Sequence, residues 1–166
     1  IVGIDIGTSK VSTVVGEVNN FNQIEIICST KSKCAGMKKG KIINEEEVAT
    51  AIAKTIKEAE EEANLRINSA YVTIPGKYTT IVQNSTIKEL KEKYTSISAK
   101  DVSAAIGQVR DINIPDGQTL IDIVPDKFVL GDGKEVSNPV GSISSQFTLS
   151  AQIILADKTY VRQLYT

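Results

Sequence analysis

The stretch Asp5-Ile6-Gly7-Thr8-Ser9-Lys10 connects the first two β-strands that the sequence predicts, and the interpretation of the whole chain starts from it. Residues 1–6, 11–18 and 23–33 are rich in β-branched and apolar side chains, and short polar turns separate them. Strands joined this closely pair with their chain neighbours. We therefore expect an antiparallel meander of three strands.

The same hexapeptide holds side chains that could bind a phosphate. Gly7 permits a tight turn and a close approach of backbone N–H groups, while Thr8 and Ser9 add hydroxyl donors. Lys10 adds a positive charge, and Asp5 could hold the waters of a Mg²⁺ ion. The spacing is not that of a Walker loop. Taken alone, the stretch fits a solvated hairpin turn as well as a nucleotide site.

Composition excludes several classes of function. The chain has 166 residues, no histidine and a net charge of -1. Without an imidazole there is no Ser-His-Asp site, so we assign no catalytic residue and no metal site. The charge argues against nucleic acid as a partner. Cys28 and Cys34 lie too far apart along an extended segment for a disulfide, so we expect reduced thiols in a cytoplasmic protein.

A long amphipathic helix follows a loop of glycine and lysine over residues 36–41. Asn44 is a good N-cap and Glu47 stands at the capping-box position, which predicts a helix over residues 45–64. A short apolar strand over residues 70–74 ends at Pro75-Gly76. These elements predict an α/β layer whose helix covers one side of the sheet. The apolar face of the helix consists of Val48, Ala51, Ile52, Thr55, Ile56, Ala59 and Ala63.

After Pro75-Gly76 the pattern restarts as an α+β unit with the order strand, helix, strand, strand. Ser98 and Asp101 predict the start of the helix, between extended segments over residues 80–87 and 119–130. Pro125 lies inside the second of these segments and implies an edge strand or a bulge. A strand over residues 146–156 ends at Asp157, the N-cap of a further helix. We expect that helix to present Val161, Leu164 and Tyr165 on one face.

Four further stretches give the chain a family resemblance. An initial strand followed by D-x-G-T-x-K resembles the opening of the actin-like ATPase superfamily. Residues 36–44, GMKKGKIIN, resemble the G-M-x-K-G segment of the FtsA family of bacterial cell-division proteins. Residues 70–78 (AYVTIPGKY), 123–128 (IVPDKF) and 138–141 (NPVG) resemble segments at and inside that family's extra subdomain. The matches occur in order and extend over essentially the whole chain.

The resemblance implies an actin-like, ribonuclease H-like fold. Residues 1–78 would form part of subdomain 1A, residues 79–156 an inserted 1C subdomain of the SHS2 type, and residues 157–166 the start of a helix that returns to 1A. The first phosphate loop would be the hairpin, with Asp5, Gly7, Thr8, Ser9 and Lys10 as residues that bind ATP and Mg²⁺ in the intact protein. The sequence contains no second loop of the type D-x-G-G-G-T. We therefore expect this stretch alone to bind ATP weakly or not at all.

The resemblance also implies a scaffold rather than an enzyme, with at most a weak ATPase activity in the intact protein. Family members tether FtsZ to the cytoplasmic face of the inner membrane through a C-terminal helix, recruit later division proteins and self-associate through the inserted subdomain. Two alternatives remain open. A PilM-like protein of type IV pilus assembly would share the core and a similar insertion, and a sugar or acetate kinase would share only the first loop.

Overall fold

The computed structural model describes residues 1–90 and 94–165, which form two compact units. The first is Ile1–Pro75 and the second is Gly76–Thr166. The sequence placed the boundaries after residues 78 and 156, and it assigned the last segment to the first subdomain. By its contacts that segment belongs to the second unit, and Thr166 lies outside the described residues. No helix in the described part of the chain is long and apolar enough to cross a membrane.

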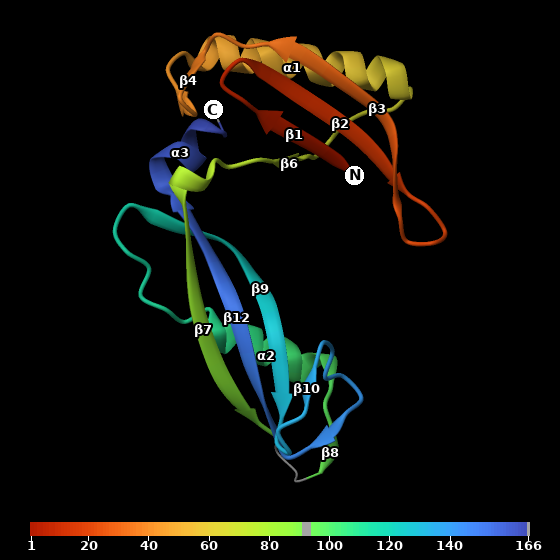
Figure 1. Ribbon diagram of the computed structural model, residues 1–166, viewed down its shortest axis with the longest axis vertical. Helices are drawn as coiled ribbons and strands as arrows, with labels where there is room; N and C mark the ends of the chain where they lie inside the picture. The colour runs from red at the N-terminus through yellow and green to blue at the C-terminus, as the bar shows by residue number, and fades with distance from the viewer. Residues whose placement is uncertain (91–93, 166) are drawn as a thin grey trace. The chain divides into compact units, whose positions relative to one another are not determined.

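A four-stranded sheet forms the first unit, with the order β3-β2-β1-β6 (Figure 1). The strands β1 (Val2–Ile6), β2 (Lys10–Val18) and β3 (Ile24–Lys33) are the predicted antiparallel meander. The short strand β6 (Tyr71–Val72) lies parallel to β1. The end of β1 and the start of β2 therefore meet at the hairpin that the sequence singled out.

The helix α1 (Glu45–Ala63) packs against β2 and β3, as the apolar pattern predicted. The Asn44 side chain accepts a hydrogen bond from the Glu47 N–H at 3.2 Å, which satisfies one free donor of the first turn. The helix ends at Asn64, whose φ of 50° is left-handed. Buried side chains on the sheet-facing side are Val48, Ala51, Thr55 and Ala59.

The segment over residues 36–41 is not the irregular loop that we expected. It contains a small hairpin of β4 (Met37–Lys38) and β5 (Lys41–Ile42). Lys39 and Gly40 at its tip have φ angles of 49° and 71°, as a type I′ turn requires. Met37 and Ile42 are both buried and face each other across the hairpin. Burial of this pair organises a segment that otherwise consists of glycine and lysine.

The second unit contains the sheet β10-β9-β12-β7, covered on one face by α2 (Ala99–Val109). The long strands β7 (Thr79–Glu89), β9 (Gln118–Leu130) and β12 (Gln146–Asp157) are antiparallel, so the predicted order of strand, helix, strand, strand is confirmed. Ser98 and Asp101 form the predicted capping box. Short elements complete the unit: η1 (Gly76–Tyr78), β10 (Glu135–Val136), and the pair β8 (Thr95–Ser96) and β11 (Ile143–Ser144).

Pro125 lies where the pairing of β9 with β12 changes register. Ser150 is opposite Lys127, but Ala151 is opposite Pro125, so Asp126 is an extra residue on β9. Proline cannot donate to a β-ladder, and a bulge on a strand near the sheet edge accommodates it. Of the two alternatives that the sequence implied for this position, the bulge is therefore the one present, since β10 and not β9 is the edge strand of this sheet.

The last helix, α3 (Lys158–Gln163), begins as predicted but buries a different side chain. The Asp157 carboxylate accepts a hydrogen bond from the Tyr160 N–H at 2.8 Å. Tyr160 is buried and its ring stacks on Tyr78, with 4.1 Å between ring centroids. Tyr165 is 88% exposed, so its assignment to the apolar face was wrong. The helix is too short for a stable 3.6-residue pattern, and packing against Tyr78 decides which side faces inward.

Candidate functional site

The turn between β1 and β2 is closed by a backbone hydrogen bond. The Gly7 N–H donates to the Lys10 carbonyl oxygen at 2.9 Å. A Cβ atom at position 7 would lie only 3.0 Å from that same oxygen. Glycine is therefore needed for the close approach of the two strand ends, and its N–H serves the turn itself.

The side chains at the tip of this hairpin have the chemistry of an anion site. Thr8, Ser9 and Lys10 are exposed, so two hydroxyls and one ammonium group are available on a short segment. These groups can donate to phosphate oxygens, and the ammonium supplies the balancing charge. Asp5 precedes them on β1 and is exposed as well. The structure thus keeps the predicted candidates Asp5, Gly7, Thr8, Ser9 and Lys10 within one hairpin.

Two neighbours of the hairpin were not found from the sequence. The Thr73 hydroxyl donates to Asp5 Oδ1 at 2.8 Å, and the Gly40 N–H donates to Thr8 Oγ1 at 3.2 Å. Thr73 reaches Asp5 because its own N–H continues the parallel pairing with β1, at 3.0 Å from the Ile4 carbonyl. These contacts orient one carboxylate and one hydroxyl. Both residues belong to stretches that carry the family resemblance, but their pairing depends on tertiary contacts.

The residues present suit a hydrated Mg²⁺ ion better than a directly ligated metal. No group of three or more His, Cys, Asp or Glu side chains gathers in the described ranges 1–90 and 94–165. Asp5 is a lone carboxylate, and the Thr73 hydroxyl donates to its Oδ1. Mg²⁺ keeps several waters and takes few carboxylates directly, so the donor set fits a nucleotide-bound Mg²⁺.

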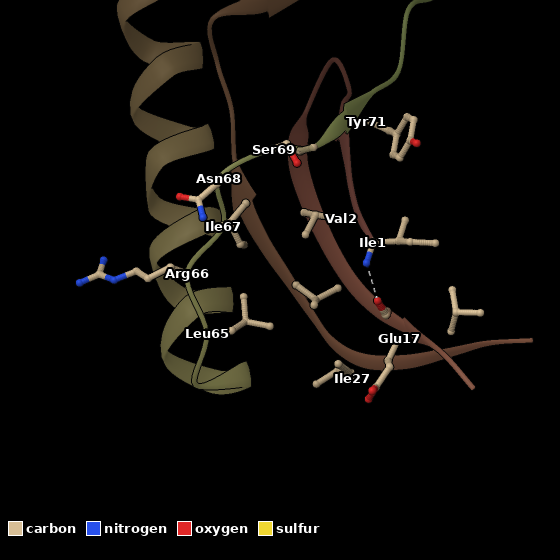
Figure 2. A pocket seen from close by; sticks show the side chains of 14 residues that line it. Ile1, Val2, Glu17, Ile27, Leu65, Arg66, Ile67, Asn68, Ser69 and Tyr71 are labelled. Atoms are coloured by element: carbon tan, nitrogen blue, oxygen red, sulfur yellow. Dashed lines mark hydrogen bonds between the residues drawn. The ribbon is translucent and has the colours of Figure 1, made fainter. Parts of the chain in front are cut away.

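A hollow of the first unit lies away from this hairpin (Figure 2). It has a volume of about 890 Å³ and opens beside the beginning of β1, at Ile1 and Val2, whereas the hairpin is at the end of that strand. Leu65 and Ile67 line it, but Arg66 points away and pairs with Glu60 at 3.1 Å. Its polar side chains do not converge, so we assign no binding site to it.

Neither cysteine has the features of a reactive thiol. Cys28 and Cys34 are both free and buried, as expected for reduced thiols. Burial, followed by the nearby Glu62 carboxylate, raises the pKa of the Cys28 thiol above its ordinary value. A raised pKa disfavours the nucleophilic thiolate. The structure places these thiols in the packing of the first unit and not in the candidate site.

Comparison with known proteins identifies the second unit. A family model described as the SHS2 domain inserted in FtsA matches residues 76–155. The cell-division protein FtsA of Pseudomonas aeruginosa is 30% identical over 141 residues, which are 85% of this chain and 33% of that protein. The FtsA of Borreliella burgdorferi is 29% identical over 99% of this chain and 40% of that protein.

This chain is a homologue of FtsA. It spans between a third and two fifths of the length of these FtsA relatives. A solved structure of the PilM-PilN type IV pilus biogenesis complex has a chain that matches 99% of this one, with a TM-score of 0.55 and 16% identity. At that identity the likeness shows the fold alone. The predicted fold class, an actin-like α/β subdomain followed by an SHS2-type unit, is confirmed.

Proposed function

We propose that this chain is part of an actin-like scaffold of bacterial cell division. The observation that supports this most strongly is similarity to FtsA proteins over 85–99% of the chain, together with the SHS2 domain inserted in FtsA. In this proposal the intact protein works on the cytoplasmic face of the inner membrane, through a C-terminal segment outside this sequence. It tethers FtsZ, recruits later division proteins and self-associates through the inserted subdomain.

We also propose that the intact protein binds ATP with Mg²⁺, and that the β1–β2 hairpin is one wall of that site. The Thr8 and Ser9 hydroxyls and the Lys10 ammonium would contact the phosphates, and Asp5, oriented by Thr73, would hold waters of the ion. Binding rather than turnover is the expected role, so the protein is a scaffold and not an enzyme. The hairpin alone offers one wall, and this chain by itself should bind ATP weakly or not at all.

Isothermal calorimetry tests the nucleotide part of the proposal. Titration of ATP and Mg²⁺ into this chain should give no saturable binding at micromolar concentrations, and a micromolar dissociation constant would contradict the expectation. In the full-length protein, Lys10→Ala should weaken ATP binding. Lys33→Ala is the matched control. Lys33 lies opposite Lys10 on β3, and its substitution removes the same charge from outside the turn. Equal effects of the two substitutions would exclude a specific role for Lys10.

Co-sedimentation tests the scaffold role. The full-length protein should pellet with FtsZ polymers and with liposomes of anionic lipid, and failure to pellet with either would remove the support for a division role. A PilM-like pilus function is the second candidate, favoured only by a likeness of fold. It predicts binding to an inner-membrane pilus peptide instead of FtsZ. A sugar or acetate kinase would be revealed by transfer of phosphate to a small substrate.

A further inference from the structure

The strand β7 is a long sheet edge that lacks the usual protection. Its register with β12 continues from Thr79 to Glu89 without a shift, and it contains no proline. The opposite side of the same sheet has Pro125 and two register shifts on β9, and β10 pairs with its end. Natural proteins protect exposed edges with proline, bulges or covering strands. In the part of the chain that the structure describes, one side of this sheet is protected and the other is not.

The backbone groups of β7 that point away from β12 belong to its odd-numbered residues. In an antiparallel pair, the N–H and C=O groups of alternate residues point to opposite sides of the strand. Just beyond β7, the Leu90 N–H donates to the Ser145 carbonyl at 3.0 Å, so even-numbered residues face β12. The Ser85 N–H does not bond β12 and instead donates to Oδ1 of the neighbouring Asn84 at 2.9 Å. Odd-numbered positions therefore present their hydrogen-bonding groups to the open edge.

The odd-numbered side chains occupy the face of the sheet that α2 does not cover. Val82 packs against the core below α2, and Asn84 donates to the Val109 carbonyl at 3.0 Å, so even-numbered side chains point toward the helix. On the other face, Ile81 is 61% exposed and Ile87 is 58% exposed. Two large apolar side chains thus flank Gln83 and Ser85 along one exposed edge.

We propose that two copies of this chain pair through β7 in an antiparallel arrangement, with the two-fold axis at Asn84. Position i of one copy is then opposite position 168 − i of the other. Ile81 lies opposite Ile87 of the second copy, and Gln83 lies opposite Ser85. All four of these positions are odd-numbered, so the residues that meet are those whose backbone groups face the open edge. On pairing, the Ser85 N–H would exchange its hydrogen bond to the Asn84 side chain for one to the Gln83 carbonyl of the second copy. The two sheets would become one.

The sequence of β7 favours this register over its neighbours. A shift by two residues in either direction places Ile81 opposite Ser85 or Glu89 and loses both apolar pairs. In the proposed register Lys88 lies opposite Thr80, and no two like charges face each other directly. Cross-strand pairs of β-branched residues stabilise a sheet, whereas opposed like charges destabilise it. This self-complementarity is the argument for a second copy as the occupant of the edge.

One pair of strands buries far less than the roughly 800 Å² per partner of a stable interface, so we expect weak association in solution. The contact would gain strength where many copies are aligned, because each pairing then raises the effective concentration for the next. The alignment of many copies rests on the proposed scaffold function. The pairing itself depends on this chain alone.

Cysteine cross-linking tests the register. Gln83→Cys and Ser85→Cys variants, prepared with tags of different mass, are mixed and oxidised at high protein concentration. A disulfide between the two variants should form faster than either variant forms one with itself. Val124→Cys is the control, since Val124 lies on the same face of β9 and is 41% exposed. Native Cys28 and Cys34 are buried and stay in place.

Sedimentation velocity tests the apolar pairs. Ile87→Lys changes both symmetric pairs at once and should raise the dimer dissociation constant roughly 2- to 30-fold. Val124→Lys adds the same charge to the same face and should leave the constant unchanged. Circular dichroism confirms that each variant is folded. Three results would each overturn the proposal. They are a mixed disulfide that forms no faster than that of Val124→Cys, cross-linking mainly of Ser85→Cys with itself, and equal effects of the two lysine substitutions on the dissociation constant.

The two proposals can fail separately. A chain that pairs in this register but whose full-length form binds neither FtsZ nor liposomes leaves the edge contact standing and removes the division role. A full-length protein that binds both, while this chain shows no pairing, keeps the division role and removes the edge contact.

Discussion

A buried pair of threonine hydroxyls between α1 and the first sheet allows a sharp test of the structure. Thr13 on β2 and Thr55 on α1 are both fully buried, and their Oγ1 atoms lie 2.8 Å apart. The Thr55 hydroxyl donates to the Ile52 carbonyl at 2.9 Å. Its single proton is therefore used within the helix, and the Thr13 hydroxyl must be the donor to Thr55.

This direction predicts unequal costs for two similar substitutions. Thr55→Val leaves the Thr13 donor buried with no acceptor and should lower the free energy of unfolding by about 1–3 kcal/mol. Thr13→Val removes one bond but leaves Thr55 bonded to Ile52, so about 0.5–1.5 kcal/mol is expected. The double variant has no buried hydroxyl left at either position. Its cost should fall short of the sum of the single costs by about 1 kcal/mol.

Native-state hydrogen exchange of amides in β2 and α1 measures these differences in the first unit by itself. As a control, Thr55→Val is combined with Ser98→Ala, which lies in the second unit. The costs of these two substitutions should add within about 0.5 kcal/mol. If the Thr13 and Thr55 costs also add, the two hydroxyls are not coupled. If Thr13→Val costs more than Thr55→Val, the direction of the hydrogen bond deduced here is wrong.

Three further predictions concern stability. Gly36→Ala should lower the free energy of unfolding by about 1–3 kcal/mol in urea denaturation, because its Cβ would overlap the Asn44 carbonyl oxygen. Gly3→Ala has open space around its Cβ and should cost about 1 kcal/mol or less. Because the pKa of the Cys28 thiol is raised in the fold, this thiol contributes stability below about pH 9, and the contribution is lost at higher pH. The decrease of the free energy of unfolding with rising pH should therefore be shallower in Cys28→Ala, and an unchanged slope would exclude the effect. Ser98→Ala removes the hydroxyl of the capping box and should cost about 1 kcal/mol by thermal melting, with no loss if the cap contributes nothing.

Much of the fold follows from local patterns in the sequence. The meander, the helix from Glu45 and the capping box at Ser98 depend on turn residues, helical spacing and caps, all of which act over a few residues. The small hairpin at Met37–Lys38 and Lys41–Ile42 could not be predicted in this way. Its stability comes from burial of Met37 and Ile42, and no periodic pattern marks a strand of two residues.

The sequence by itself determined which chemical groups occupy the candidate site, because Asp5, Thr8, Ser9 and Lys10 are contiguous and their turn is local. Only the tertiary structure decided which groups orient them. Thr73 reaches Asp5 through a parallel strand pairing, and Gly40 reaches Thr8 from a separate hairpin. Parallel pairing and contacts between hairpins join residues that are distant in the chain. The periodicity of side chains along one strand does not indicate which other strand or hairpin will lie beside it. The free edge of β7 has the same origin, because a strand's place in the sheet is set by its neighbours.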